Sequence, residues 1–286
     1  MPETWTILGV LSWTTQYFGE KKIASPRLDA EVLLSHVLHC DRVGLYVRFE
    51  QPLERGELDA FRELVRRRAA GEPVAYLTGT REFWSLPLRV DPRVLIPRLE
   101  TELVVDVILE VTRDTPAGLA CDVGTGSGAI ALALKRERPA WTVVATDVSA
   151  AALEVARENA ARLAIDVEFL EGDMLRPLAG RGPFDVIASN PPYVAEAEVA
   201  TLMREVAEHE PRVALTPGGD GLAAIRQLVG GAPALLGPAG ALVLEIGYQQ
   251  GPAVRSLVAA TGAFGPPTVR RDHAGLDRVL CARRLG

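Results

Sequence analysis

The segment with the clearest chemical meaning is Asn190-Pro191-Pro192-Tyr193, which directly follows an apolar run over residues 184–189. Two successive prolines fix the backbone and remove two N–H donors, so the segment offers mainly acceptors. The side-chain oxygen of Asn190 and the carbonyl oxygen of Pro191 can point at one place, and a planar –NH2 group matches that pair with its two donors. Tyr193 can then lie flat against the planar group. The segment therefore predicts a binding site for an amino or amide group, and a purely structural proline turn is the simpler alternative.

A glycine-rich turn predicts a cofactor site. The stretch Asp122-Val123-Gly124-Thr125-Gly126-Ser127-Gly128 follows one expected strand and opens an expected helix. Glycines let the backbone turn tightly and let a ligand approach it closely, so an adenine-nucleoside cofactor fits there. The predicted cofactor-binding residues of the turn are Gly124, Thr125, Gly126, Ser127 and Gly128, and Asn190 is counted with them. The same glycines also satisfy a dinucleotide fingerprint, so this turn alone leaves a nicotinamide cofactor open.

Two acidic residues and a methionine follow at the expected strand ends. Asp147 ends the second strand, 147 − 124 = 23 residues after Gly124, where a carboxylate can accept hydrogen bonds from both ribose hydroxyls. The alternative role is a helix N-cap, although Ser149 is better placed for it. Asp173 can accept from an adenine amino group and Met174 can pack on the ring, and a turn-forming aspartate is the alternative there.

These residues together favour methyl transfer to a planar nitrogen. An amide nitrogen is a poor nucleophile, because its lone pair is delocalised into the carbonyl, whereas a sulfonium methyl group is already activated by its cofactor. The protein must then hold the nitrogen in line with the methyl group at about 3–3.5 Å. Fixed acceptors favour a nitrogen that is becoming tetrahedral and acidic. No strong general base is evident in the motif.

Strands and helices alternate from about residue 99. The expected strands are Leu119 to Val123, Trp141 to Thr146, Val167 to Leu170, Phe184 to Ala188, Ala241 to Ile246, Thr268 to Arg270 and Val279 to Ala282. The expected helices between them are Ala129 to Arg138, Ala150 to Leu163, Gly221 to Leu236 and Pro252 to Ala260. Alternation of this kind predicts an α/β fold with an open, mostly parallel sheet and helices on both faces.

The first 75 residues have helical character. Ser25-Pro26 predicts a helix start, with a capping hydroxyl followed by proline in the first turn. A second helix is expected from Glu54 to Ala70, where glycine and then proline form a stop signal. Arg66-Arg67-Arg68 closes this helix, and we interpret it as a solvated last turn that complements the helix dipole, with a docking patch as the alternative.

A short extended segment separates the two regions. Leu86, Leu88 and Val90 occupy alternate positions, which indicates a strand, and Pro87 favours an edge position. The predicted organisation is a helical domain over residues 1–78, a β-hairpin connector over 79–98 and an α/β domain over 99–286.

Composition excludes several classes of protein. The chain has 286 residues and a net charge of −6, whereas a protein that binds a nucleic-acid backbone usually has a basic surface. No apolar run reaches the roughly 18 residues of a membrane span and no secretory signal is visible, so we expect a cytoplasmic protein without a membrane segment. Three scattered cysteines predict neither a disulfide framework nor a structural zinc site. His36, His39 and Cys40 are near one another in sequence, but a helix face explains them better, so we expect no metal.

At the Asn190 motif the sequence resembles the HemK/PrmC family, the protein-glutamine methyltransferases of peptide-chain release factors. The tetrapeptide alone is shared with several amino-directed methyltransferases, but the resemblance covers nearly the whole chain. Its markers are Arg81-Glu82-Phe83-Trp84-Ser85-Leu86-Pro87-Leu88, Ile96-Pro97-Arg98-Leu99-Glu100-Thr101-Glu102, the glycine turn, the Asn190 motif and Leu244-Glu245-Ile246-Gly247-Tyr248-Gln249-Gln250-Gly251.

The resemblance implies a fold, a cofactor and a substrate. The fold would be a seven-stranded, Rossmann-like class I methyltransferase domain, preceded by a small all-α domain that helps to grip the release factor. The cofactor would be S-adenosyl-L-methionine, with S-adenosyl-L-homocysteine as product. The substrate would be the Gly-Gly-Gln glutamine of class 1 release factors, bound by Asn190 to Tyr193 with Asn190, Pro191 and Tyr193 as catalytic residues. Arg98, Glu100 and Glu102 would also line the substrate pocket, although Glu100 and Glu102 also suit a helix N-terminus. We expect a monomer that forms no stable complex with nucleic acid.

Three other functions remain to be weighed. A nucleic-acid amino methyltransferase would use the same acceptors on a flipped base, but it predicts a basic channel. A nicotinamide-dependent oxidoreductase needs a proton donor, and neither His209 nor His273 has a suitable context. A cofactor-binding module without activity is disfavoured by the intact acceptor motif.

Overall fold

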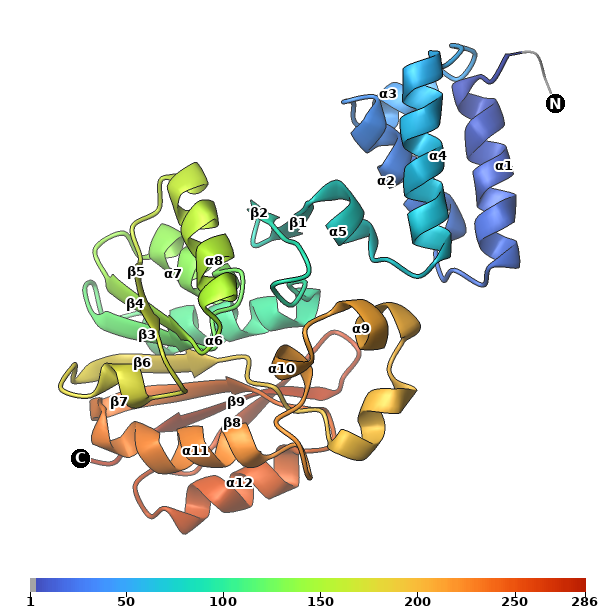
Figure 1. The fold of residues 1–286 in the computed structure, drawn as a ribbon. Coiled ribbons are helices and arrows are strands. Elements are labelled where there is room, and N and C mark those ends of the chain that lie inside the picture. The colour runs from blue at the N-terminus through green and yellow to red at the C-terminus, as the bar shows by residue number, and fades with distance from the viewer. Residues whose placement is uncertain (1–3) are drawn as a thin grey trace. The chain divides into compact units, whose positions relative to one another are not determined.

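The strands of the α/β region form a seven-stranded sheet in the computed structural model, which describes residues 4–286 (Figure 1). The strand order is β5-β4-β3-β6-β7-β9-β8. The strands β3 to β7 run parallel to one another, while β9 lies antiparallel to both β7 and β8. The bounds are β3 Leu119–Val123, β4 Thr142–Asp147, β5 Glu168–Glu171, β6 Phe184–Ser189, β7 Leu236–Glu245, β8 Thr268–Arg271 and β9 Asp277–Arg283. The predicted mostly parallel sheet is confirmed.

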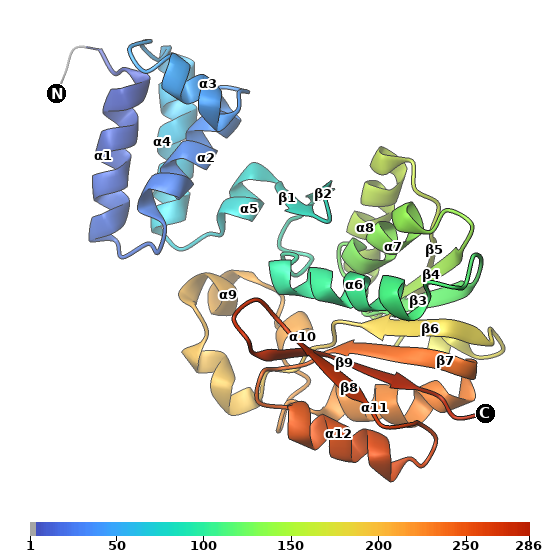
Figure 2. The ribbon, with the colours of Figure 1, turned by 180° about the vertical axis from the view of Figure 1, so that it is seen from behind.

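Alternating strand residues build a separate core on each face of the sheet. Ala120 and Val243 belong to one buried cluster, together with residues of α6, α7 and α8, whereas Cys121 and Leu242 belong to another, with α11 and α12. Figures 1 and 2 show the same two layers, with these helices on opposite sides of the sheet. The helices are α6 Glu102–Val111, α7 Ala129–Glu137, α8 Ala150–Leu163, α11 Ala223–Gly231 and α12 Gly251–Ala260. Burial on both faces explains why the central strands β3, β6 and β7 are mostly apolar.

The chain divides into two compact units. Unit 1 comprises the described residues up to Gly79 together with Met203–His209, and unit 2 comprises Thr80–Leu202 and Glu210–Gly286. The helices of unit 1 are α1 Ile7–Glu20, α2 Pro26–Val37, α3 Arg42–Val47, α4 Arg55–Ala69, α5 Val74–Thr78 and α9 Arg204–His209. Leu11, Phe18, Leu33 and Phe61 are among the side chains of its own buried core.

Two local expectations for unit 1 are wrong. The helix α2 begins at Pro26 as predicted, but the Ser25 side chain makes no capping hydrogen bond. Arg68 is only 8% exposed, so it does not belong to a solvated last turn. Its guanidinium donates to Asp29 at 2.8 Å and pairs with Glu205 at 2.6 Å. Arg68 is buried because it lies on the inner face of α4, where its charge is paired with two carboxylates.

The segment that leads into β7 also differs from the prediction. The expected helix Gly221 to Leu236 ends at Gly231, followed by a 3-10 turn at Ala232–Ala234, and β7 begins at Leu236, earlier than the expected Ala241. Pro233 lacks the N–H needed to continue the helix. Leu236 is buried and pairs with Phe184 across an irregularity in the register. Further short helices at Leu99–Thr101, Arg176–Leu178, Glu196–Thr201 and α10 Arg212–Leu215 had no sequence signal that we used.

A two-stranded hairpin opens unit 2, and a buried asparagine is one of the side chains that hold it there. The strands β1 Thr80–Phe83 and β2 Leu86–Arg89 are antiparallel, as expected for a hairpin. Asn159, fully buried on α8, accepts from the Arg89 N–H at 2.7 Å and donates to the carbonyls of Arg89 and Ser127 at 3.0 Å each. One side chain therefore joins the hairpin, α8 and the glycine turn.

None of the helices in residues 4–286 has the length and apolar character needed to span a lipid bilayer. Within the same residues, no three His, Cys, Asp or Glu side chains gather closely enough to hold a metal ion.

The Asn159 contacts predict a large effect on stability. Asn159→Ala removes three hydrogen bonds and leaves buried backbone groups unpaired, so we expect the free energy of unfolding to fall by about 3 kcal/mol. Chemical denaturation followed by circular dichroism measures the loss. Arg157→Ala, on the exposed side of the same helix, is the control and should change stability by less than about 0.5 kcal/mol. Equal effects of the two substitutions would contradict the assigned role of Asn159.

Candidate active site

A cavity of about 300 Å³ lies in unit 2 at the carboxyl ends of the parallel strands. The chain runs from β3 outward to β4 and β5, and then returns to place β6 on the other side of β3. Ligands bind at such a reversal in open α/β sheets, because the connections diverge there. The residues that line the cavity are Arg93, Val94, Leu95, Val123, Gly124, Gly126, Asp147, Val148, Ser149, Ala152, Gly172, Asp173, Met174, Asn190, Pro192, Pro211, Val213, Ala214, Thr216 and Pro217. The site therefore gathers predicted residues from the ends of four strands.

The glycine turn exposes backbone to this cavity. Gly124 and Gly126 have φ angles of +73° and +56°, in the left-handed region that favours glycine. A Cβ atom at either position would meet no heavy atom within 4 Å, so the space beside the turn is open. Thr125 and Ser127 are buried instead, and Gly128 caps α7. The predicted binding turn thus consists of two glycines that face the cavity and three residues that hold them.

Asp147 performs two tasks at the end of β4. Its Oδ2 accepts from the Gly126 N–H and its Oδ1 from the Ser149 N–H, both at 2.9 Å. Ser149 is the N-cap of α8, since its hydroxyl accepts from the Ala152 N–H at 3.1 Å. Burial raises the pKa of Asp147, although these N–H groups oppose the shift. Asp147 lines the cavity and keeps lone pairs for a ligand, so ribose binding remains our prediction for it.

A buried carboxylate beneath the turn was missed by the sequence reasoning. Asp122 is only 2% exposed and its Oδ2 accepts from the Thr125 hydroxyl at 2.6 Å and the Ala131 N–H at 3.2 Å. Its Oδ1 is buried without a hydrogen-bond partner among residues 4–286. Burial, with a contribution from the charge of Asp147, raises the pKa of Asp122 to about 7. Two carboxylates beside open glycines fit a cofactor that has an adenosine part and a positive charge.

Asp173 and Met174 follow β5 and both line the cavity. Met174 adopts a φ of +47° and packs against the core on the α11 side of the sheet. The Asp173 side chain is about half exposed and makes a long 3.9 Å ion pair with Arg176. The structure therefore brings both residues to the site, and their contacts with adenine remain predictions.

The Asn190 side chain is held by a buried chain of hydrogen bonds. Its Nδ2 donates to Thr101 Oγ1 at 3.1 Å, and the Thr101 hydroxyl donates to Glu245 Oε2 at 2.6 Å. Tyr193 donates its hydroxyl to Glu245 Oε1 at 3.2 Å. Thr101 and Glu245 are 4% and 1% exposed. Since the amide nitrogen is used by Thr101, the oxygen is the end of Asn190 that remains for a ligand in the cavity.

Of the other predicted substrate residues, Pro192 lines the cavity, whereas Pro191, Tyr193, Arg98 and Glu100 lie outside its lining. Pro191 is buried, and Tyr193 is fixed by Glu245 through its hydroxyl and by Gln250, which donates to its carbonyl at 2.9 Å. Arg98 forms an ion pair with Glu210, and Glu100 lies exposed in the turn before α6. Glu102 accepts from the Trp84 N–H at 2.7 Å and so holds the hairpin turn. Roles for Arg98 and Glu100 in substrate binding remain predictions.

Several residues of the site carried no assigned role from sequence. Thr101 and Glu245 belong to the quoted family markers, and Asp122 opens the glycine turn, so each had a signal that sequence reasoning did not use. The cavity-lining stretch over residues 211–217 lies far from every motif and offered no signal.

Comparisons with known proteins agree with this architecture. A family model described as PrmC N-terminal domain matches residues 9–79, and one described as methyltransferase small domain matches residues 101–237. A release factor glutamine methyltransferase from Geobacter sulfurreducens is 45% identical over 99% of this chain and 98% of its own length. One from Moorella thermoacetica is 47% identical, over 92% of this chain and 93% of its own. A solved methyltransferase from Pyrococcus furiosus superposes with a TM-score of 0.51 at 18% identity, covering 77% of this chain and 98% of its own.

The sheet order and the cavity at the strand reversal define a class I, S-adenosylmethionine-dependent methyltransferase. With relatives this similar over almost their full length, the chain belongs to the release factor glutamine methyltransferase family.

The carboxylates of the site predict a pH-dependent cofactor affinity. A positively charged cofactor stabilises ionised Asp122, whose pKa is raised to about 7, so binding should release a proton and strengthen as the pH rises through 7. We expect up to about tenfold tighter S-adenosylmethionine binding at pH 8 than at pH 6, equivalent to about one pKa unit. Calorimetry in buffers of different ionisation enthalpy measures both the affinity and the proton release.

The matched variant is Asp122→Asn, which imitates the protonated carboxyl group. It should fold at pH 6 and bind with an affinity that no longer rises with pH. A wild-type affinity independent of pH, or an unchanged dependence in the variant, would show that Asp122 does not sense the cofactor charge.

Proposed function

We propose that this protein methylates the side-chain amide nitrogen of the glutamine in the Gly-Gly-Gln motif of class 1 peptide-chain release factors, with S-adenosylmethionine as methyl donor. The observation that carries the proposal is the fixed Asn190 amide, whose nitrogen is bound by Thr101 while its oxygen is left for the cavity that contains the glycine turn. Membership of the release factor glutamine methyltransferase family supports the choice of substrate.

The site residues can favour reaction at an amide nitrogen. S-adenosylmethionine supplies a methyl group that is activated by its sulfonium sulfur. The Asn190 oxygen accepts a hydrogen bond from the substrate –NH2, and the Pro191 carbonyl is the predicted second acceptor. Both acceptors become stronger partners as the nitrogen gains the methyl group and positive charge, so they stabilise the transition state more than the bound amide. The methyl group leaves neutral S-adenosylhomocysteine behind, and the nitrogen releases its proton to water only once it has become acidic, so the site requires no strong base.

The first test is mass spectrometry of unmodified release factor incubated with the protein and S-adenosylmethionine. We expect one added methyl group on the glutamine of the Gly-Gly-Gln peptide. Asn190→Ala should lower the rate by at least about 100-fold, as happens when a preorganised polar partner of the transition state is lost. Its affinity for S-adenosylmethionine should stay close to that of the wild type.

Gln249→Ala is the control, because it removes an exposed side-chain amide that, among residues 4–286, bonds only to Tyr248. It should methylate at the wild-type rate. Transfer to RNA or DNA with none to the release factor would favour the nucleic-acid amino methyltransferase instead. Loss of cofactor binding in a folded Asn190→Ala protein would remove Asn190 from its proposed role.

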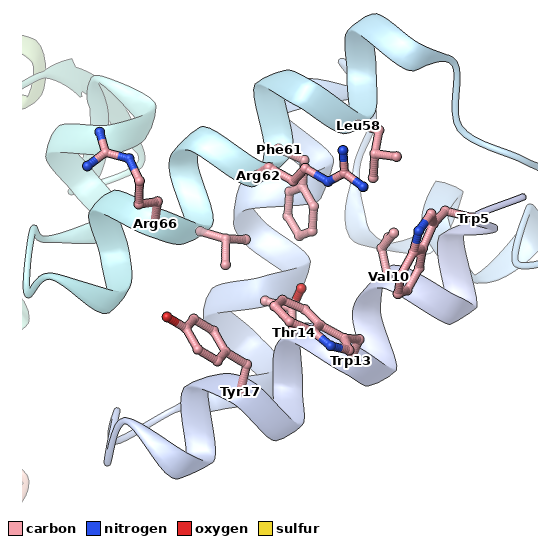
Figure 3. Close-up of a pocket in the computed structure, with 10 residues that line it drawn as sticks. Trp5, Val10, Trp13, Thr14, Tyr17, Leu58, Phe61, Arg62 and Arg66 are labelled. Carbon is pink, nitrogen blue, oxygen red and sulfur yellow. The ribbon is translucent and has the colours of Figure 1, made fainter. Parts of the chain in front are cut away.

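A groove in unit 1 is the proposed docking surface for the release factor. It has a volume of about 770 Å³, and Figure 3 shows Trp5, Trp13 and Tyr17 of the α1 side facing Phe61 and Arg62 of α4. Its lining residues are Trp5, Val10, Trp13, Thr14, Tyr17, Leu58, Phe61, Arg62, Val65 and Arg66. Trp13 stacks on Tyr17 with ring centroids 5.1 Å apart and is 51% exposed. Large exposed aromatic side chains in a hollow are typical anchors of protein–protein contacts.

The chemistry of the groove fits an apolar segment flanked by carboxylates. Arg62 and Arg66 pair with Asp59 and Glu63 on the exposed face of α4, and such pairs contribute little, so they exchange readily for a partner's carboxylates. In the proposal, residues 1–78 recognise the release factor, residues 79–98 connect, and residues 99–286 catalyse. The net charge of −6 favours a protein partner over nucleic acid. In the proposal, the protein acts as a monomer in the cytoplasm, where translation ends.

The docking surface predicts a substrate-dependent effect of Trp13→Ala. The KM for full-length release factor should rise by about 10-fold or more, as for an anchoring aromatic residue. The kcat/KM for a short peptide containing Gly-Gly-Gln should not change, because the peptide lacks the part of the release factor that is proposed to bind the groove. Steady-state kinetics with both substrates measures the difference. Leu8→Ala, an exposed position of α1 outside the groove, is the control, and equal KM values for Trp13→Ala and wild type would reject the surface.

A further inference from the structure

The direction of the Asn190 amide depends on residues that do not line the cavity. An asparagine amide has an accepting end and a donating end of nearly the same shape. The proposed substrate also presents an –NH2 group, so only the oxygen of Asn190 can accept from it. A reversed amide would place two donors against each other. The site therefore needs a feature that selects one of the two orientations.

We propose that Glu245 and Thr101 are positioning residues that turn the Asn190 oxygen toward the substrate, an inference that rests on the proposed function. The Thr101 hydroxyl group has one hydrogen, and it donates this hydrogen to Oε2 of Glu245 in a 2.6 Å hydrogen bond. The Thr101 oxygen is then only an acceptor, and Nδ2 of Asn190 donates to it at 3.1 Å. The carboxylate thus fixes the amide through one intervening hydroxyl group.

The burial and the hydrogen bonds of Glu245 keep the donor–acceptor direction of this chain of hydrogen bonds fixed. Glu245 ends β7 and is only 1% exposed, and Thr101, at 4%, closes the turn before α6. Tyr193 donates to the second oxygen of the same carboxylate at 3.2 Å. An ionised carboxylate only accepts, so both hydroxyl groups must point toward it. Water cannot readily rearrange hydrogen bonds that are buried to this extent.

A protonated Glu245 would lose this selection. The carboxyl group could donate to Thr101, whose hydrogen would then be free to meet the oxygen of a reversed Asn190 amide. The charged or titratable groups around Glu245 are Tyr193, Arg278 of β9 and Glu100 of the turn before α6. The positive charge of Arg98 in turn favours the ionised form of Tyr193. Burial is the largest influence and raises the pKa of Glu245, while Thr101, Arg278 and Tyr193 oppose the rise. Transfer should therefore be complete above this raised pKa and be lost as the pH falls through it.

The test compares Thr101→Val, Thr101→Ser and Glu245→Gln. Thr101→Val removes the hydroxyl at nearly constant volume, and Glu245→Gln makes a donor available at the same place. Both should lower kcat by roughly 10- to 100-fold, the loss expected when a reacting group is misplaced. The affinity for S-adenosylmethionine should not change. Thr101→Ser keeps the hydroxyl and should recover most of the rate, and the acid limb of the wild-type pH profile should vanish in Glu245→Gln.

The control is Thr112→Val, which removes another buried hydroxyl, one that donates to the Ile108 carbonyl at the end of α6. It should keep the wild-type kcat. A direct readout is the NMR signal of the Asn190 side-chain –NH2, which should shift in Thr101→Val but not in Thr112→Val. This signal does not depend on turnover, so a failure of the proposed function leaves the inference testable. Wild-type kcat in Glu245→Gln, or equal rates in Thr101→Val and Thr101→Ser, would overturn it.

Discussion

The reversal of strand order between β3 and β6 is the constraint on which the site depends. Parallel strands all end at the same edge of the sheet, and the connections after β3 and β6 leave in opposite directions. The space between them is bordered by Gly124 after β3 and Asn190 after β6, while Asp147 and Asp173 come from the neighbouring strands. Each of these residues is placed by the strand before it, so the precision of the site comes from the apolar pairing of the sheet.

The same edge concentrates negative charge. The pKa values of Asp122, Asp147 and Glu245 are all raised by burial, which means that the folded protein holds these carboxylates at a cost. Backbone N–H groups, hydroxyl groups and Arg278 offset part of this cost. A cationic methyl donor offsets more of it when it binds, since unpaired buried charge is stabilised by an opposite charge. A site that is less stable without its cofactor is a common consequence of preorganisation for function.

Local patterns in the sequence predicted the strands and helix caps that depend on residues close together in the chain. The strand Leu119–Val123 was predicted with its observed bounds, because a short, mostly apolar run lies between Gly118 and Gly124. Ser149 was correctly expected to cap α8. Interactions between distant residues were not predicted. Thr101 and Glu245 are 144 residues apart, and the burial of Arg68 depends on Asp29, 39 residues away. The periodicity of the sequence does not predict such pairs, because their contact depends on how whole helices and strands pack together.

The choice of asparagine at position 190 shows how these constraints combine. A carboxylate there would accept from the substrate in either orientation and would need no help from Thr101. It would also add another negative charge beside carboxylates whose pKa values are already raised, and it would then tend to hold a proton and donate. A neutral amide avoids that charge but has two different ends. The buried Thr101–Glu245 pair resolves the ambiguity with a charge that lies behind the amide, where it orients Asn190 without touching the substrate. Tyr193 holds the other oxygen of the same carboxylate. The acceptor that the chemistry requires therefore depends on Asn190, Thr101, Glu245 and Tyr193 together, and not on the asparagine alone.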